Sequence, residues 1–211
     1  EHTFEVLDGE IGKELLDGGI KYWLKGLGYY DSGSRSFYTK ERPVNSPEDL
    51  KGLKIRVMES VTAMKMVSSL GGSPTPISWG ELYTSLQQGV VDGAENNPPS
   101  FYLSRHYEVC KYYSLDEHTS IPDVLIIGTH LWNRLSDQEQ EWLQSAVDKS
   151  VTYQRKLWKI AEKEALDAVI KAGVEVIIPD KTLFAEKVKN MYEEYKDDDE
   201  IYNLIQRIQA K

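Results

Sequence analysis

The sequence has 211 residues, enough for one large domain or two small ones. Lys and Arg number 25 and Asp and Glu number 34, so the formal net charge is −9 at pH 7. A phosphate backbone repels such a chain, and we therefore expect no nucleic-acid partner. Net charge acts on solubility rather than on local chemistry, so a site in which a few arginines bind a small anion is not excluded.

Motifs for catalysis and metal binding are missing from the sequence. Cys110 is the only cysteine, which rules out an intramolecular disulfide and a cysteine-based zinc site. His2, His106, His118 and His130 show no metal-ligand spacing. No nucleophile elbow, phosphate loop or dinucleotide fingerprint occurs, and no apolar run reaches the length of a membrane span. We expect a binding protein without cofactor or metal, and not an enzyme.

The first part of the chain mixes helical and extended patterns. Residues 4–27 carry apolar side chains at helical spacing, interrupted by Gly18 and Gly19. Residues 29–39 look extended, with Gly33 as a bend. These patterns predict a helix that ends or restarts at the glycine pair, followed by a bent strand.

A strand–helix–strand unit follows and is the most regular pattern in the chain. Residues 53–57 predict a strand, 61–70 a helix and 73–77 a second strand. A helix over 80–88 and a strand over 90–94 repeat this rhythm. Such units imply a parallel sheet with right-handed crossovers, and therefore an α/β fold.

The last third of the chain is dominated by one long helical pattern. After strands over 109–115 and 124–128, nothing interrupts helical spacing across residues 136–172. At about 1.5 Å per residue, this helix would be roughly 55 Å long. That length predicts a helix that braces two lobes. A strand over 174–178 and two amphipathic helices close the chain.

Several polar side chains stand at predicted strand ends, where α/β sheets bind ligands. Arg56 offers a two-pronged donor suited to a carboxylate, or it is a surface arginine on an edge strand. Asn96, beside Glu95 and Asn97, suits hydroxyl and carbonyl groups, or it forms an Asx turn that caps the next helix. Trp79 either stacks on a ligand or belongs to the core.

The same residues carry a family resemblance. The chain reads DLKGLKIRV at residues 49–57, GGSPTP at 71–76 and GELYTSLQQGVVDGAEN at 80–96. The order and spacing of these blocks strongly resemble the DctP-type solute-binding proteins of TRAP transporters. The resemblance extends over essentially the whole chain, and residues 33–38 and 94–101 look like the branch that binds sugar acids.

The resemblance implies a set of ligand-binding residues. Arg56 matches the arginine that pairs with the ligand carboxylate, and Arg35 matches a second arginine of the same pocket. Trp79 matches the aromatic pocket wall and Asn96 the pocket asparagine, with Glu95 and Asn97 beside it. Glu59 lies at a variable specificity position.

The fold that the resemblance implies is a two-lobed α/β clamp of the periplasmic-binding-protein type, similar to type II, with parallel-rich sheets and a long bracing helix. Relatives carry a further segment before the position of Glu1, so we expect the first lobe to be incomplete. Residues 1–28 and 122–150 would be its remnant, and 29–121 with 174–211 the second lobe. The helix over 136–172 would span both lobes.

The resemblance implies that the protein captures a small organic acid in the periplasm, or elsewhere outside the cytoplasm. It would then deliver the acid to a TRAP membrane permease. Glu59 would repel a second negative charge, which favours a uronate or related sugar acid over the alternative, a C4-dicarboxylate. Less favoured alternatives are an α/β enzyme that uses His118 or the region of Glu95 on a sugar acid, and association of two copies through an uncovered half-lobe.

Overall fold

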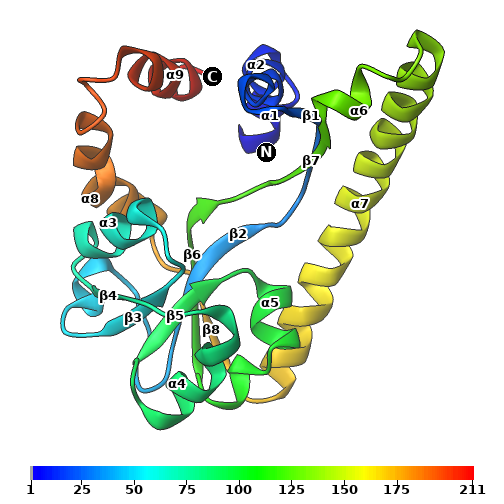
Figure 1. Ribbon diagram of the computed structural model, residues 1–211. Helices are drawn as coiled ribbons and strands as arrows, with labels where there is room; N and C mark the ends of the chain where they lie inside the picture. Colours follow the sequence, from blue (N-terminus) through cyan, green and yellow to red (C-terminus); the bar gives the residue numbers. More distant parts are fainter. Residues whose placement is uncertain (1) are drawn as a thin grey trace. The chain divides into compact units, whose positions relative to one another are not determined.

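The computed structural model describes residues 2–211 (Figure 1). Contacts divide the chain into two compact units, each built from segments that are distant in the sequence. Unit 1 contains the described residues up to Ser32 together with Ile121–Ile160 and Asp198–Lys211. Unit 2 contains Gly33–Ser120 and Ala161–Asp197. None of the helices in the described residues is both long and apolar enough to cross a membrane.

Unit 2 is built on a six-stranded sheet with the strand order β4-β3-β5-β2-β6-β8. Strands β4, β3 and β5 are parallel, β2 is antiparallel to both of its neighbours, and β8 is parallel to β6. The expected parallel-rich sheet is confirmed, with β2 as the one reversed strand in unit 2. The bounds are β2 Ser34–Thr39, β3 Lys54–Val57, β4 Ser73–Pro76, β5 Gly93–Asn96, β6 Tyr112–Ser120 and β8 Glu175–Ile177.

Helices cover both faces of this sheet, because successive strand residues point to opposite sides. Phe37 faces a core that includes residues of α3 and α8. Its neighbour Tyr38 faces a second core with residues of α4, α5 and the end of α7. The helix bounds are α3 Val61–Ser69, α4 Leu82–Gln88, α5 Pro98–Leu103, α7 Asp137–Lys171 and α8 Lys181–Glu193, and the short 3₁₀ helices are η2 Pro47–Leu50, η3 Trp79–Glu81 and η4 His106–Glu108.

Unit 1 pairs two antiparallel strands, β1 and β7, with helices. The Tyr29 hydroxyl donates to the carbonyl oxygen of Gly12 at 2.8 Å, and Arg155 forms a two-pronged ion pair with Asp8. These contacts join β1 and α7 to the first two helices. The bounds are α1 His2–Leu7, α2 Glu10–Gly18, η1 Ile20–Tyr22, β1 Leu24–Tyr30, β7 Asp123–Gly128, α6 Thr129–Trp132 and α9 Asp199–Gln209.

Helix α7 is one uninterrupted helix of 35 residues, as the sequence predicted. Ser136 and Glu139 form a capping box at its start: the Ser136 amide and hydroxyl both donate to the Glu139 carboxylate at 2.8 Å. Gly173, with φ of +90°, ends the helix in a left-handed conformation that favours glycine. The boundary between the two units falls within this helix, at residues 160 and 161.

The structure differs from the predicted elements in several places, and the expected bent strand over 29–39 is two strands, β1 and β2, in different sheets. Residues 24–27 form the start of strand β1 and not a helix, and Gly26 lets this strand approach Leu16 more closely than a Cβ atom would allow. Strand β5 begins at Gly93 and not at Val90. The prolines after Asn97 open helix α5, because a proline lacks only an N–H that is unsatisfied in the first helical turn.

The two units also differ from the predicted domain boundaries. Residues 29–32 belong to unit 1 by their contacts, and so do residues 198–211, which were assigned to the second lobe. Arg207 of α9 forms an ion pair with Glu14 of α2 within unit 1. The further division of the chain into lobes of a clamp stays a prediction.

Gly93 provides a test of the sheet packing. A Cβ atom at Gly93 would lie 2.4 Å from the carbonyl oxygen of Tyr38, which is backbone and cannot rotate away. We predict that Gly93→Ala lowers the free energy of unfolding by about 1–3 kcal/mol. The control Gly80→Ala, where a Cβ atom meets nothing within 4 Å, should change it by less than about 0.5 kcal/mol. Urea unfolding measures both; equal effects would contradict the packing described.

Candidate functional site

Four strand ends of unit 2 meet at one edge of the sheet. Strands β3 and β5 finish there with their carboxyl ends, and the reversed strand β2 starts there, with Ser36 opposite Asn96. Strand β6 also ends there, with Thr119 opposite Arg35. The reversal of β2 is the reason why Arg35, at the beginning of its strand, lies beside residues at the ends of theirs.

Arg35 is held by a buried carboxylate and an amide. Its Nε donates to Glu95 Oε2, and one terminal nitrogen donates to Glu95 Oε1 and to the Glu95 carbonyl oxygen, both at 2.8 Å. The other terminal nitrogen donates to Asn96 Oδ1 at 2.9 Å. Burial alone would lower the pKa of Arg35, but the bonds and charge of Glu95 raise it. The charge of Arg35 is therefore compensated within the protein.

A large bulge in β6 brings two more charged groups to this edge. Ser114 lies opposite Phe37 and Thr119 opposite Arg35, so residues 115–118 stand against Ser36 alone. Glu117 adopts a left-handed φ of +49° within the bulge. The result is that Asp116 and His118 are both buried beside β2, where Asp116 accepts a hydrogen bond from the Phe37 amide at 3.0 Å.

His118 is charged in this environment. Its Nδ1 bonds Asp116 Oδ2 at 2.6 Å, its Nε2 lies 3.6 Å from Glu95 Oε2, and its ring stacks on Phe37 at 4.2 Å. Burial alone would lower the pKa of His118, but Asp116 and then Glu95 raise it to about 9. A protonated imidazole cannot accept a proton, which argues against the alternative that His118 is a catalytic base.

Arg56 lies in a different environment. It is only 4% exposed, and its Nε donates to the Ile77 carbonyl oxygen at 2.8 Å. Its guanidinium lies 5.6 Å from the ring centroid of Trp79. Among residues 2–211, no acidic side chain forms an ion pair with it. Burial is the main cause that lowers the pKa of Arg56, and the charge of Arg35 adds to it, whereas Glu95 acts in the opposite direction without forming an ion pair. A buried guanidinium of this kind is suited to an anion from outside.

The strand register explains why Arg56 and Glu95 do not pair. Arg56 lies beside Ala94, and Ala94 lies opposite Tyr38, so these three side chains share one face of the sheet. Glu95 lies opposite Phe37 and therefore points to the other face. The two charges belong to adjacent strands, but the sheet separates them.

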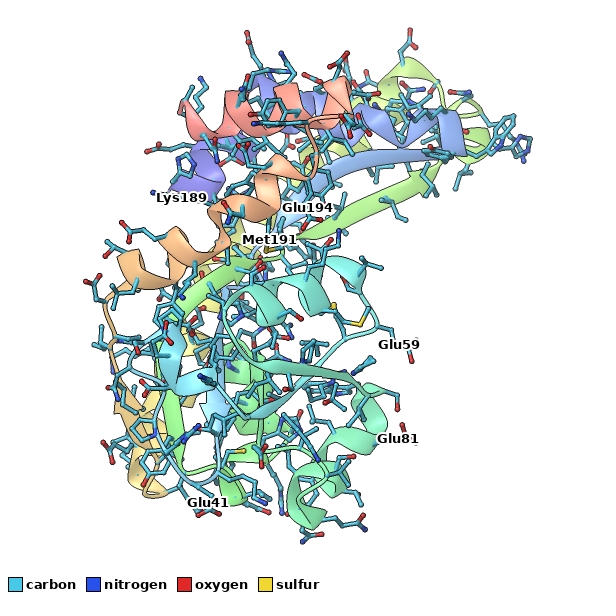
Figure 2. All side chains as sticks on the ribbon, turned by 90° about the vertical axis from the view of Figure 1, so that its left-hand side faces the viewer. Glu41, Glu59, Glu81, Lys189, Met191 and Glu194 are labelled. Atoms are coloured by element: carbon cyan, nitrogen blue, oxygen red, sulfur yellow. The ribbon has the colours of Figure 1, made fainter. Side chains whose placement is uncertain are left out.

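Three predicted site residues remain, and they lie on different parts of unit 2: Trp79, Asn97 and Glu59. Trp79 is 45% exposed on η3, so the alternative that it belongs to the core is wrong. Asn97 caps helix α5 by accepting from the Ser100 amide at 2.8 Å, which is the Asx capping considered for its neighbour Asn96. Glu59 is exposed after β3, and Figure 2 shows its side chain pointing away from the ribbon.

Four residues near this edge were missed as contributors to the binding site. The sequence analysis noted that His106 lacks metal-ligand spacing and considered His118 only for an alternative enzyme, and it did not single out Asp116 or Tyr38. His106 is buried beneath Trp79 and bonds the Tyr38 hydroxyl. No local pattern marked His106, because it stands among polar residues such as Ser104, Arg105 and Glu108. Within the described chain, no group of three or more His, Cys, Asp or Glu side chains is placed to hold a metal ion.

The buried charges at this sheet edge do not cancel. Arg35, Arg56 and His118 are positive, and Glu95 and Asp116 are negative. One positive charge is left over, and by position it belongs to Arg56. The site is therefore suited to a ligand group with a single negative charge.

Comparison with known proteins identifies the family. The model of bacterial extracellular solute-binding proteins, family 7 (DctP), matches residues 1–198. This chain belongs to that family, which confirms the resemblance read from its sequence. An uncharacterized protein of Salmonella typhimurium, YiiZ, is 44% identical over 212 residues, covering 100% of this chain and 65% of that protein. The chain spans 63–65% of the length of its first curated relatives.

Solved structures of the same fold confirm the α/β class. A TRAP periplasmic solute-binding protein from Roseobacter denitrificans with bound β-D-glucuronate has a TM-score of 0.95 and 40% identity, covering 100% of this chain and 70% of that one. A TRAP periplasmic solute-binding protein from Xanthobacter autotrophicus with bound β-D-galacturonate has a TM-score of 0.92 and 43% identity, covering 99% and 70%.

The charge of His118 makes a pH-dependent contribution to stability. Because its folded pKa is raised from 6.5 to about 9, this contribution is complete below pH 6.5 and is lost as the pH rises through about 9. At pH 6 the free energy of unfolding of the wild-type protein should exceed that of His118→Gln by on the order of 3 kcal/mol. This difference should shrink toward pH 10.

Urea unfolding of both proteins at several pH values between 6 and 10 measures this difference. The matched control is His130→Gln, at an exposed histidine of α6. The difference in free energy of unfolding between this control and the wild type should not change over the same pH range. A His118→Gln difference that is equally independent of pH would show that His118 is not charged in the folded protein.

Proposed function

We propose that this chain is part of the extracytoplasmic solute-binding protein of a TRAP transporter, which captures a small organic acid through Arg56. The ligand carboxylate would occupy the free donors of the Arg56 guanidinium, whose planar fork matches the two carboxylate oxygens. The protein would carry the acid to the membrane permease without converting it.

The observation that carries this proposal is the buried, uncompensated charge of Arg56. Removing a guanidinium from water is costly unless an anion replaces the lost solvent. Arg35 lies on β2, two strands away from β3 in the same sheet, and has that anion in Glu95. The contrast between the two arginines supports Arg56 as the residue that an external carboxylate completes.

Arg35 then has a different role from the one expected of it. The family resemblance placed Arg35 in the ligand pocket as a second arginine. Because Arg35 already binds Glu95 and Asn96, we propose that it orients Asn96 toward the ligand. Asn96 Oδ1 accepts from Arg35 and from the Asn97 amide, so the Asn96 amide group keeps its N–H donors for ligand oxygens.

We propose a sugar acid with one carboxylate, such as a uronate, as the ligand. A single uncompensated positive charge supports a monoanion, and the exposed carboxylate of Glu59 would disfavour a second negative charge. The structural relatives named above hold glucuronate and galacturonate. A relative from Rhodobacter capsulatus, 30% identical over 173 residues, is a C4-dicarboxylate-binding protein, and this ligand class is the alternative.

The family supports a proposal for the compartment and the partner. Two relatives are named as periplasmic binding proteins, and a structural relative as a TRAP periplasmic solute-binding protein, which supports an extracytoplasmic location and a membrane permease as partner. Association of two copies stays a prediction.

Replacement of Arg56 by lysine tests the proposal. A lysine keeps the charge but offers a point donor in place of the planar fork. In the complete protein, Arg56→Lys should raise the Kd for D-glucuronate at least about tenfold, with little change in the melting temperature. Isothermal titration calorimetry measures the affinity. The control Arg134→Lys, at an exposed arginine, should bind as the wild type does. Wild-type affinity in the Arg56→Lys variant would contradict the proposed role.

A further inference from the structure

A buried histidine lies behind the exposed face of the site. His106 is 1% exposed and stands at the start of η4, directly after Arg105. Arg105 adopts a left-handed φ of +57°, which is uncommon for a residue other than glycine. The His106 carbonyl oxygen accepts hydrogen bonds from the amides of Val109 and Cys110. The backbone thus holds this residue in one place.

The imidazole of His106 is fixed by a tyrosine from the centre of the sheet. The Tyr38 hydroxyl lies 2.9 Å from His106 Nδ1, and the Tyr38 ring packs on Phe101 and Tyr113. Burial strongly raises the pKa of Tyr38, so the hydroxyl keeps its proton. A neutral hydroxyl can donate to Nδ1 or accept from it, and a bond in either direction fixes the orientation of the imidazole.

Trp79 lies against this imidazole. The two rings meet edge to face, with centroids 5.2 Å apart and an interplanar angle of 63°. The same indole has the Arg56 guanidinium 5.6 Å from its centroid. His106 is the only aromatic partner of Trp79 among residues 2–211. A half-exposed tryptophan that rests on one buried ring depends on that ring for its orientation.

His106 supports Trp79 without adding charge beside Arg56. Burial, and then the charge of Arg56, lower the pKa of His106 to about 4. The imidazole is uncharged at neutral pH, so it does not compete with Arg56 for an anion. The carboxylate of a ligand would be recognised by Arg56, and the apolar face of a sugar ring would find its contact on the indole.

We propose that His106, held by the Tyr38 hydroxyl, is a positioning residue that supports Trp79 beside Arg56 and so gives the site its preference for acids that carry a sugar ring over small acids. This inference rests on the proposed function and adds a source of selectivity to it. His106 itself does not touch the ligand.

Two substitutions separate ring support from simple folding. His106→Asn keeps an acceptor for the Tyr38 hydroxyl and removes the ring behind Trp79. His106→Phe keeps a ring behind Trp79 and leaves the Tyr38 hydroxyl without its partner. Glu108→Gln, on the same 3₁₀ helix and facing Tyr83, is the matched control.

The readout is the ratio of the Kd for glycolate to the Kd for D-glucuronate in the complete protein, with glycolate measured by competition, beside the melting temperature. His106→Asn should lower this ratio about fivefold to tenfold, with the Kd for glycolate within about twofold of the wild type. His106→Phe should melt at a lower temperature and keep the ratio within about twofold. Glu108→Gln should change neither Kd.

Two results would overturn the inference: a His106→Asn ratio within about twofold of the wild type, or losses of affinity for both acids that follow the melting temperature in both variants. Wild-type protein that binds neither acid would instead overturn the proposed function, and this inference with it. The two failures are therefore distinguishable.

Discussion

The ion pair between Arg35 and Glu95 is the interaction on which the rest of the site depends. It exists because β2 runs against its neighbours, so that the first residues of one strand meet the last residues of another. Because Glu95 binds Arg35 and faces away from Arg56, the positive charge of Arg56 has no carboxylate partner. Of the two buried arginines at this sheet edge, Arg35 is paired with a carboxylate and Arg56 is not.

This arrangement has a cost that the protein tolerates. Burying an ion without a partner costs several kcal/mol, and a buried ion pair seldom adds net stability over apolar packing. The network of Arg35, Glu95, His118 and Asp116 is therefore better understood as a scaffold for geometry than as a source of stability. A preorganised site loses less entropy when a ligand binds, which offsets the cost of an uncompensated Arg56.

The local elements were predictable because their signals are local. Periodicity and glycine stops located the unit over residues 53–77 and the long helix α7, and Arg56 lies at the carboxyl end of a parallel strand as expected. The family and its α/β class followed from blocks whose order and spacing are specific.

The hydrogen bonds and ion pairs within the site were not predictable in the same way. The pair of Arg35 and Glu95 requires the reversal and register of β2, which periodicity does not reveal. The bulge that buries Asp116 and His118 depends on a hydrogen bond that the Phe37 amide donates to the Asp116 carboxylate, 79 residues away. His106 gains its place from Tyr38, 68 residues earlier in the chain. Such partners are set by tertiary structure, which overrides local preference.

The central claim is that one positive charge, on Arg56, is left for the ligand. Calorimetric comparison of D-glucuronate with succinate, in the complete protein at neutral pH, tests it most directly. The second carboxylate of succinate would be desolvated without a compensating charge, so D-glucuronate should bind at least about tenfold more tightly. Succinate that binds as tightly as D-glucuronate, or more tightly, would contradict this account.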